Sequence, residues 1–212
     1  MNLDKHPFPD HLSSWATTNL SAKQIDMLEA YRELLLVHSS RMSLISKTDL
    51  PNIWGRHICD SLGPAAFIDF SKSGRWVDLG CGAGLPLIPI AIALPHWEIV
   101  GLDTRNLRIE LLREFVEILG LKNCLPIKGN ARVLGMEDQH CMRYDIASTR
   151  AVGKIKEDAI LAAPFLKPGG RFITFKGSEH VERIDGYRAP TYTPYRLPGV
   201  DNDLHLVQTV KL

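Results

Sequence analysis

The chain has 212 residues, of which 25 are Lys or Arg and 24 are Asp or Glu, so its formal charge at pH 7 is only +1. A composition of 45% hydrophobic and 23% charged residues is typical of one compact globular domain, with or without a modest extension, and excludes a disordered, collagen-like or strongly acidic chain. The near-neutral balance gives no overall electrostatic case for nucleic acid, so such a case must come from local charge.

The sequence also excludes a membrane span and a secretory signal. The longest apolar run, residues 85–94, is interrupted by Pro86 and Pro89, whereas a span needs roughly 18 apolar residues. The first ten residues contain no apolar core, and the four cysteines are scattered without a Cys-x-x-Cys pair. We therefore expect a cytoplasmic protein with reduced thiols, and no metal site, because no histidine falls at ligand spacing from a cysteine.

Helical signals come first along the chain. Ser21 and Gln24 form a capping box ahead of apolar residues at helical spacing, and Pro51 suits the first position of a second helical segment. From Gly74 onward, short apolar runs alternate with longer amphipathic stretches. The expected strands are 75–79, 97–102, 124–128, 144–148 and 171–176, with two more around 192–196 and 205–211. The expected helices between them are 85–94, 105–119 and 157–166.

This alternation predicts an α/β domain in which crossover units build a parallel sheet. We divide the chain into an N-terminal helical extension, residues 1–73, and the α/β domain, residues 74–212, which together form one compact unit. Near the end of the last expected helix, Lys167-Pro-Gly-Gly170 predicts a helix stop and a turn into the next strand.

One glycine-rich segment joins an expected strand to an expected helix: Trp76-Val-Asp-Leu-Gly80-Cys-Gly82-Ala-Gly84-Leu-Pro86. Glycines at such a junction let the chain turn sharply and let a ligand approach the backbone, although a plain tight turn has the same pattern. Leu85 stands where a dinucleotide fingerprint has its last glycine, and Asp78 precedes the loop. A carboxylate there suits a positively charged ligand, and S-adenosylmethionine (AdoMet), with its ammonium and sulfonium groups, fits that preference.

An acidic residue ends the next expected strand. Asp103 lies 19 residues beyond Gly84, where a carboxylate can accept both ribose hydroxyls of an adenosine. The alternative is that Asp103 only caps the helix that follows it. The end of the third expected strand would bring Gly129–Ala131 beside the adenine ring, where backbone N–H groups can contact it.

The fourth expected strand ends in Ala147-Ser-Thr-Arg150, at the edge where this kind of sheet presents the methyl group. The Asn/Asp-Pro-Pro-aromatic sequence typical of amine methylation is absent, and Cys141 is not placed as the nucleophile of a pyrimidine-C5 methylase. Guanine N7 has a lone pair and no proton to lose, so its methylation needs alignment and exclusion of water. Arg150 suits guanine O6 or a phosphate, the alternative being a salt bridge or a buried capping role.

Local charge agrees with an anionic partner. Between residues 150 and 178 there are six Lys or Arg residues and two acidic ones, which would contact phosphates if they shared an edge, although a solvated helix face gives the same pattern. Lys176 ends the fifth expected strand at the ligand edge, where it could hold a phosphate or stay in solvent.

From about Leu28 onward the chain resembles the bacterial small-subunit ribosomal RNA guanine-N7 methyltransferases, historically called glucose-inhibited division protein B. The segments that carry the resemblance are Arg56-His-Ile-Cys-Asp-Ser61, Val77-Asp-Leu-Gly-Cys-Gly-Ala-Gly-Leu-Pro86, Leu112-Arg-Glu114, Thr149-Arg-Ala151, Leu166-Lys-Pro-Gly-Gly170 and Phe175-Lys-Gly177. The most specific signal is the first segment, residues 56–61, in combination with the later Arg150-Ala151. The glycine segments are less specific, because they occur in many methyltransferases.

The resemblance implies a Rossmann-like class I methyltransferase fold, with a mostly parallel seven-stranded sheet that carries N-terminal helices. It implies AdoMet as cofactor, 16S ribosomal RNA or the small ribosomal subunit as partner, and a monomer. His57, Arg150 and Lys176 would form the catalytic, RNA-facing part of the site. The cofactor-binding residues would be Asp78, Gly80, Cys81, Gly82, Gly84, Leu85, Asp103, Thr104, Asn130, Ala131 and Arg150.

Three segments depart from the pattern of that family. Ser43-Leu-Ile45 replaces Asn-Leu-Thr, Asn130-Ala-Arg132 replaces Arg-x-Glu, and Leu204-His-Leu-Val207 replaces Arg-x-Leu-Val. These changes fall on the substrate side and leave the cofactor side intact. Two alternative functions therefore stay open. The chain could be a paralogue that methylates another acceptor, such as a small molecule, or a protein that binds AdoMet without catalysis. The glycine spacing argues against a nicotinamide oxidoreductase.

Overall fold

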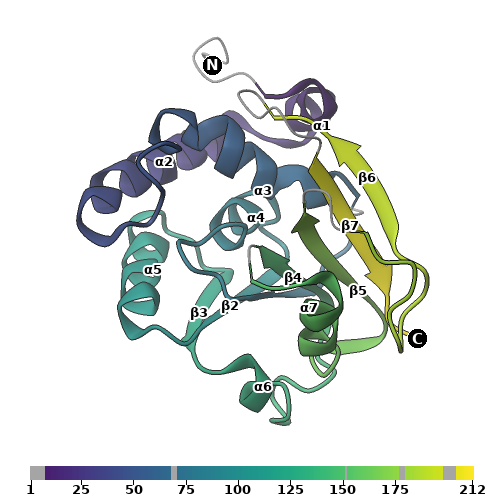
Figure 1. The fold of residues 1–212 in the computed structure, drawn as a ribbon. Helices are drawn as coiled ribbons and strands as arrows, with labels where there is room; N and C mark the ends of the chain where they lie inside the picture. The colour runs from purple at the N-terminus through teal and green to yellow at the C-terminus, as the bar shows by residue number, and fades with distance from the viewer. Residues whose placement is uncertain (1–7, 68–70, 151, 177–179, 198–203) are drawn as a thin grey trace.

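The computed structural model describes residues 8–67, 71–150, 152–176, 180–197 and 204–212, and its seven strands form one sheet (Figure 1). The strands lie in the order β3-β2-β1-β4-β5-β7-β6. Strands β1 to β5 pair in parallel, whereas β7 runs antiparallel to β5 and β6 antiparallel to β7. The predicted mostly parallel seven-stranded sheet is thus confirmed. The strand bounds are β1 Arg75–Leu79, β2 Glu98–Asp103, β3 Cys124–Lys128, β4 Tyr144–Arg150, β5 Leu166–Lys176, β6 Thr191–Tyr195 and β7 Leu204–Val210.

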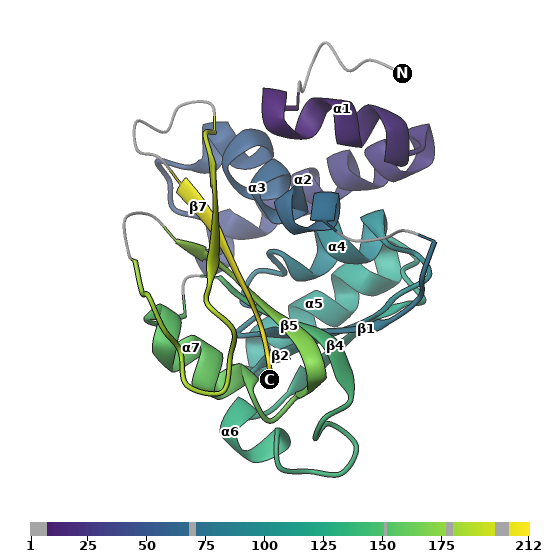
Figure 2. The same ribbon diagram turned by 90° about the vertical axis from the view of Figure 1, so that its right-hand side faces the viewer.

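Helices cover both faces of the sheet. One face carries α1 to α5, and the other carries α6 and α7 (Figures 1 and 2). The α-helices are α1 Asp10–Asn19, α2 Ala22–Met42, α3 Asp60–Leu62, α4 Leu87–Ala93, α5 Asn106–Ile118, α6 Ala131–Leu134 and α7 Ile155–Ala162. Between α2 and α3 lie a 3-10 turn, Leu50–Asn52, and a π-helix, Ile53–Cys59, and the 3-10 turn Gly63–Phe67 follows α3.

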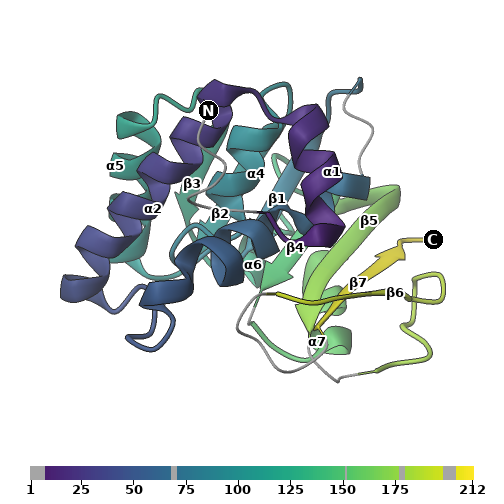
Figure 3. The same cartoon turned by 90° about the horizontal axis from the view of Figure 1, so that it is seen from above.

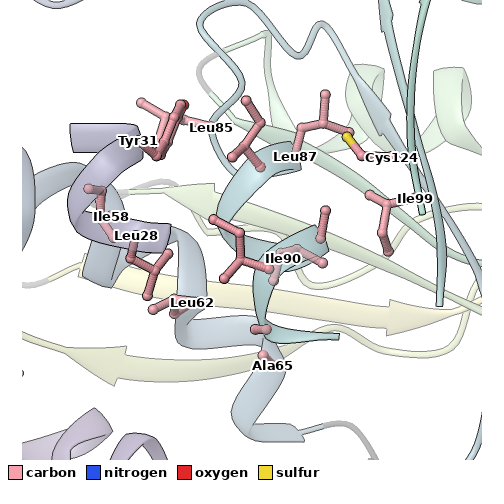
Figure 4. Close-up of a cluster of buried hydrophobic side chains, with 14 of the residues drawn as sticks. Leu28, Tyr31, Ile58, Leu62, Ala65, Leu85, Leu87, Ile90, Ile99 and Cys124 are labelled. Carbon is pink, nitrogen blue, oxygen red and sulfur yellow. The ribbon is translucent and has the colours of Figure 1, made fainter. Parts of the chain in front are cut away.

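The N-terminal helices share one hydrophobic core with the sheet. Leu28 and Tyr31 of α2 are buried in the core cluster that includes α4, which also contacts α3, and Figure 4 shows Tyr31 beside Leu85 and Leu28 beside Leu62. Seen from above, α2 lies between α4 and α5 (Figure 3). The apolar residues at helical spacing in α2 are therefore its core-facing stripe. The division of the chain at residue 73 stays a prediction.

The local sequence signals hold for most elements. The capping box of Ser21 and Gln24 is present, with the Gln24 N–H donating to Ser21 Oγ at 3.3 Å. Strands β1 and β3 have the predicted bounds, and β2, β6 and β7 lie within one residue of theirs. Helices α1 and α6 were not predicted, because α6 has only four residues and α1 lies ahead of the capping box that marks the first expected helix.

Three predicted segments need correction. The helical segment predicted from Pro51 is present, but it begins at Leu50 as a 3-10 turn and continues as a π-helix. The segment 167–170 is not a turn before a strand. Strand β5 begins at Leu166, so the two glycines lie inside it, where its pairing with β4 shifts register. Helix α7 spans Ile155–Ala162, so it begins before and ends before the predicted 157–166.

The topology places one edge of the sheet where a ligand can bind. Strand β1 is central, with β2 on one side and β4 on the other, so the strand order reverses direction beside it. In open α/β sheets, ligands bind outside the carboxyl ends of the strands at such a reversal. The glycine loop after β1, Asp103 at the end of β2 and Arg150 at the end of β4 all lie at this edge.

Candidate active site

The glycine loop after β1 is held against β2 by backbone hydrogen bonds. The N–H groups of Gly80 and Cys81 both donate to the Leu102 carbonyl oxygen, at 2.8 and 3.0 Å. Gly80 and Gly82 have positive φ angles of 76° and 53°, a conformation that other residues rarely adopt. A Cβ on Gly80 would lie 2.9 Å from Val152 Cγ2, so this position also needs glycine for space.

The third glycine of the loop faces the protein core. Gly84 has φ +92°, and a Cβ there would meet Leu112, Ile88 and the Tyr31 hydroxyl at 2.8 to 3.1 Å. The Tyr31 hydroxyl donates to the Ala83 carbonyl oxygen at 2.9 Å. Helix α2 thus supports the loop from behind, a contact that the sequence pattern did not indicate. Leu85 and Cys81 are likewise buried, and burial raises the pKa of the Cys81 thiol.

Asp78 lies buried beneath the loop with one oxygen unpaired. Its Oδ1 accepts a hydrogen bond from Ser148 Oγ at 2.8 Å, and that hydroxyl in turn accepts one from Trp76 Nε1. Its Oδ2 is buried and makes no hydrogen bond of normal geometry among the described residues, although the Leu87 N–H lies close enough to the carboxylate to favour its ionised form. Burial raises the pKa of Asp78 to about 7, although Ser148 and the charge of Arg150 oppose the shift. An unpaired buried acceptor of this kind fits a cationic ligand group.

Asp103 lies at the end of β2 with its carboxylate held by four hydrogen bonds. Oδ2 accepts from the Gly82 N–H at 3.0 Å, and Oδ1 from the Arg105 N–H at 2.9 Å. The Arg105 guanidinium donates to both oxygens, through Nε at 3.1 Å and Nη2 at 3.0 Å. Burial raises the pKa of Asp103, but the hydrogen bonds from Arg105 and Gly82 outweigh burial and lower it below its usual value.

A cavity of about 330 Å³ opens beside this carboxylate. Its size lies in the range of small-molecule sites. Among the predicted cofactor-binding residues, those that line it are Gly80, Asp103, Thr104, Asn130 and Ala131. The other lining residues are Leu102, Arg105, Gly129, Arg132, Val152 and Leu161. The cavity therefore joins the ends of β1, β2 and β3, as a nucleoside site requires.

The remaining predicted cofactor residues do not line this cavity. Asp78, Cys81 and Leu85 are buried. Gly82 contributes its N–H to Asp103, and Arg150 lies at the end of β4. In the described parts of the chain, no group of three or more His, Cys, Asp or Glu side chains could hold a metal ion. Over the same residues, no helix is both long and apolar enough to cross a bilayer.

At the end of β4, Arg150 enters a cluster of charged residues from the N-terminal segment. Its Nη2 lies 2.9 Å from Asp60 Oδ2, and it also donates to the Arg56 carbonyl oxygen and to His57 Nδ1, both at 3.0 Å. The Arg150 side chain is 16% exposed and that of Asp60 6%. The Tyr195 hydroxyl donates to the other oxygen of Asp60. We call Arg150, Asp60, His57, Asp49 and Arg56 the Arg150 cluster.

His57 is a neutral member of this cluster. Burial and the charge of Arg150 lower its pKa to about 4, against the attraction of Asp49, whose Oδ2 lies 3.7 Å from Nε2. Because the Arg150 guanidinium can only donate, His57 Nδ1 accepts and its proton is on Nε2. The π-helix provides this geometry by presenting Arg56 and His57 together, and Arg56 completes it with an ion pair to Asp49 at 2.9 Å.

Lys176 lies on the other face of the sheet. Its ammonium pairs with Asp158 of α7 at 3.1 Å and donates to the Gly153 carbonyl oxygen, and its side chain is only 10% exposed. Asp158 also accepts from the Thr149 hydroxyl at 3.1 Å. The alternative in which Lys176 stays in solvent is therefore wrong. The structure brings His57 and Arg150 together but keeps Lys176 apart from them, and its contact with RNA stays a prediction.

The residues that depart from the family pattern have local roles. Ser43 ends α2 in the left-handed conformation, with φ 48°. Asn130 caps α6, its Oδ1 accepting from the Arg132 N–H at 2.9 Å. Leu204 begins β7 opposite Tyr195. Ala151 and Gly177, which belong to two of the motifs, lie outside the described residues.

Comparison with known proteins covers most of the chain, from the N-terminal helices to the sheet. Residues 24–193 match the family described as GidB, rRNA small subunit methyltransferase G. A relative named ribosomal RNA small subunit methyltransferase G from Lysinibacillus sphaericus is 34% identical over 165 residues, covering 78% of this chain and 69% of the relative. The protein of the same name from Leuconostoc mesenteroides is 34% identical over 185 residues, covering 86% and 77%.

A solved structure, that of M. jannaschii TYW2 in complex with AdoMet, superposes with a TM-score of 0.55 at 18% identity and covers 75% of this chain and 77% of that one. This likeness agrees with the fold seen here. The family match spans the π-helix, the glycine loop, Asp103 and the end of β4. The chain belongs to the rRNA small subunit methyltransferase G family.

Proposed function

We propose that this protein transfers a methyl group from AdoMet to N7 of a guanine in 16S ribosomal RNA of the small subunit, in the bacterial cytoplasm. Membership of the family over residues 24–193 carries the choice of substrate. The cavity beside Asp103 carries the choice of cofactor, because an acidic side chain at the end of β2 meets a glycine loop there.

The residues present fit the cofactor at both of its polar ends. Asp103 would accept the ribose hydroxyls, and Gly129 to Ala131 would lie along the adenine. Asp78 is buried and does not line the cavity, so its charge would favour the ammonium group without a direct contact seen in this structure. Bound AdoMet supplies a methyl group activated by its sulfonium. The chain's own residues hold it at the carboxyl ends of β1 and β2, beside the end of β4.

On the substrate side, we assign alignment of the guanine to Arg150. Its described contacts with Asp60, Arg56 and His57 run through Nη2, so Nε and Nη1 are the atoms assigned to guanine O6 or to a phosphate. His57 is neutral and acts as a positioning residue. A base is not needed, because guanine N7 loses no proton when it is methylated.

Lys176 is assigned a positioning role as well. Its bond to the Gly153 carbonyl oxygen and its pair with Asp158 hold the segment that follows β4. Val152 of that segment lines the cofactor cavity and lies against Gly80. We therefore expect loss of the Lys176 ammonium to act on the cavity through Val152.

The test uses small ribosomal subunits from a strain that lacks the native N7 methylation. The protein is incubated with these subunits and methyl-labelled AdoMet, and the RNA is digested and searched for labelled 7-methylguanosine by mass spectrometry. Stoichiometric label is the expected result. Absence of label, from protein that binds AdoMet by calorimetry, would contradict the acceptor but not the cofactor.

A pair of arginine variants separates transfer from folding. Arg150→Ala is expected to reduce transfer per folded molecule, and also to lower the melting temperature, because it leaves the buried Asp60 carboxylate without its cation. Arg75→Ala is the control, because Arg75 pairs with Glu98 at the amino ends of the strands, away from the candidate site. An Arg150→Ala protein that melts much lower but keeps its activity per folded molecule would make Arg150 purely structural.

A further inference from the structure

The hydrogen bonds to Asp103 use all the acceptor capacity that a carboxylate has in its plane. An ionised carboxylate offers about four lone pairs, two on each oxygen. Here Oδ1 accepts from the N–H and the Nε–H of Arg105, and Oδ2 accepts from the N–H of Gly82 and from Arg105 Nη2. Two of the four donors are backbone groups, and the other two belong to one guanidinium.

A ribose would need the two positions that the guanidinium fills. The backbone donors come from the glycine loop and from the start of α5, so they stay in place and fix the orientation of the carboxylate. The vicinal hydroxyls of a ribose donate side by side to the two oxygens of a carboxylate, which is also the way a guanidinium donates. The two groups therefore compete for the same edge of Asp103.

The guanidinium is free to leave. The Arg105 side chain is 59% exposed, whereas that of Asp103 is 5% exposed. Arg105 lines the wall of the cavity, and every contact of its side chain that the structure describes is to Asp103. A long exposed side chain can therefore swing into solvent, while the buried carboxylate cannot follow it.

We propose that Arg105 is an affinity-setting residue of the cofactor site: in the free protein its guanidinium occupies the ribose-binding edge of Asp103, and the cofactor must displace it. This inference rests on the proposed function, because it takes the ligand of Asp103 to be an adenosine. The displacement lowers cofactor affinity by the strength of this ion pair, whose cation is exposed and whose carboxylate is buried. It also keeps the buried carboxylate paired when the cavity holds no nucleoside.

The experiment measures binding of S-adenosylhomocysteine, which has the same ribose without the sulfonium charge, by calorimetry to four forms of the full chain. Arg105→Leu should lower its Kd about threefold to fivefold, the size expected for loss of an exposed ion pair. Arg105→Lys should fall between, because an ammonium pairs with Asp103 without filling both positions. Arg132→Leu is the matched control, since Arg132 lines the same cavity and does not contact Asp103 through its side chain.

Salt gives a second measurement that does not depend on the variants folding equally well. Raising the ionic strength screens the exposed Arg105–Asp103 pair, so the difference in Kd between the wild type and Arg105→Leu should shrink. A general charge effect would instead change Kd equally in Arg105→Leu and Arg132→Leu.

The outcomes separate the inference from the proposed function. No binding of S-adenosylhomocysteine or AdoMet to the wild type would overturn the proposed cofactor. If the wild type binds but Arg105→Leu binds with the same or a weaker affinity, the role of Arg105 alone is overturned. The same holds if Arg132→Leu gains as much affinity as Arg105→Leu. A gain confined to position 105 that shrinks with salt would support it.

Discussion

The cavity beside Asp103 and the Arg150 cluster lie at the same edge of the sheet, yet different parts of the chain hold them in place. In the cavity, backbone N–H groups from the loops after β1 and β2 fix the carboxylate, and all lining residues follow β1 in the sequence. In the cluster, Arg150 is held by Asp60 of α3 and by the His57 side chain and Arg56 carbonyl of the π-helix, all about 90 residues away in the sequence. The comparison indicates that mutations in the first region should affect binding, and mutations in the second should affect folding.

The largest expected effect comes from removing the buried partner of Arg150. Asp60→Ala would leave a guanidinium with 16% exposure without its carboxylate, which typically costs about 3–5 kcal/mol of unfolding free energy. Urea unfolding measures this change. Glu98→Ala is the control, because its pair with Arg75 lies at the surface and should be worth less than about 1 kcal/mol. Equal losses in both variants would remove the distinction between the two regions.

Asp103→Ala tests the first region and should act on binding. Loss of the hydrogen bonds to the ribose should weaken AdoMet binding by about 2 kcal/mol, or about 30-fold in Kd. Calorimetry on the folded variant measures the change, and its melting temperature without ligand is the control. An unchanged Kd would contradict the ribose assignment and leave Asp103 with a structural role, as the partner of Arg105 and of the Gly82 N–H.

The sequence could predict the cavity because its signals are local. A strand, a glycine loop with alternating glycines and an acid after the next strand are separated by short, regular intervals, and parallel pairing brings their ends together. Asn130 and Ala131 follow by the same rule. What the pattern missed is Arg105, because the same side chain can point to solvent or back to Asp103, and only packing decides between them.

The Arg150 cluster could not be predicted from spacing. Nothing in the sequence near Asp60 indicates that it pairs with Arg150 and Tyr195, because these contacts depend on how the N-terminal helices pack across the sheet. The resemblance to a family implied that His57, Arg150 and Lys176 belong to one site. In the structure Lys176 pairs with Asp158 on the opposite face of the sheet. The π-helix has no distinct sequence signal, and Pro51 indicates only that a helical segment begins.

The pH dependence of cofactor binding should report on Asp78, which lies between the two regions. Its pKa of about 7 means that the folded protein keeps the carboxyl protonated between about pH 4 and 7, where the unfolded chain ionises it. Because the folded state holds a proton that the unfolded chain has lost, the unfolding free energy falls as pH rises through this window. The ammonium of AdoMet needs the ionised form, so affinity should rise on the order of tenfold from pH 5.5 to 7.

Other groups near the site should not produce this profile. The pKa of His57 is about 4 and that of Asp103 is lowered, so both keep one protonation state across the range. An α-amino group titrates near pH 8, above the window. Asp78→Asn keeps the shape of the side chain and should bind AdoMet with an affinity that no longer varies with pH. A profile that persists in Asp78→Asn would assign it to another group.

The smallest effect is expected where α2 supports the glycine loop. Tyr31→Phe removes the hydroxyl that donates to the Ala83 carbonyl oxygen and keeps the buried ring in place against Phe115. The loss of one buried hydrogen bond should lower the unfolding free energy by about 1 kcal/mol, measured by urea unfolding. Because Gly80 and Cys81 stay bonded to Leu102, the cavity side of the loop should be unchanged, and the Kd for AdoMet should shift less than about twofold, within what 0.5 kcal/mol gives. A large loss of affinity would mean that the N-terminal helices set the geometry of the cofactor site as well as that of the Arg150 cluster, so that the two regions respond as one.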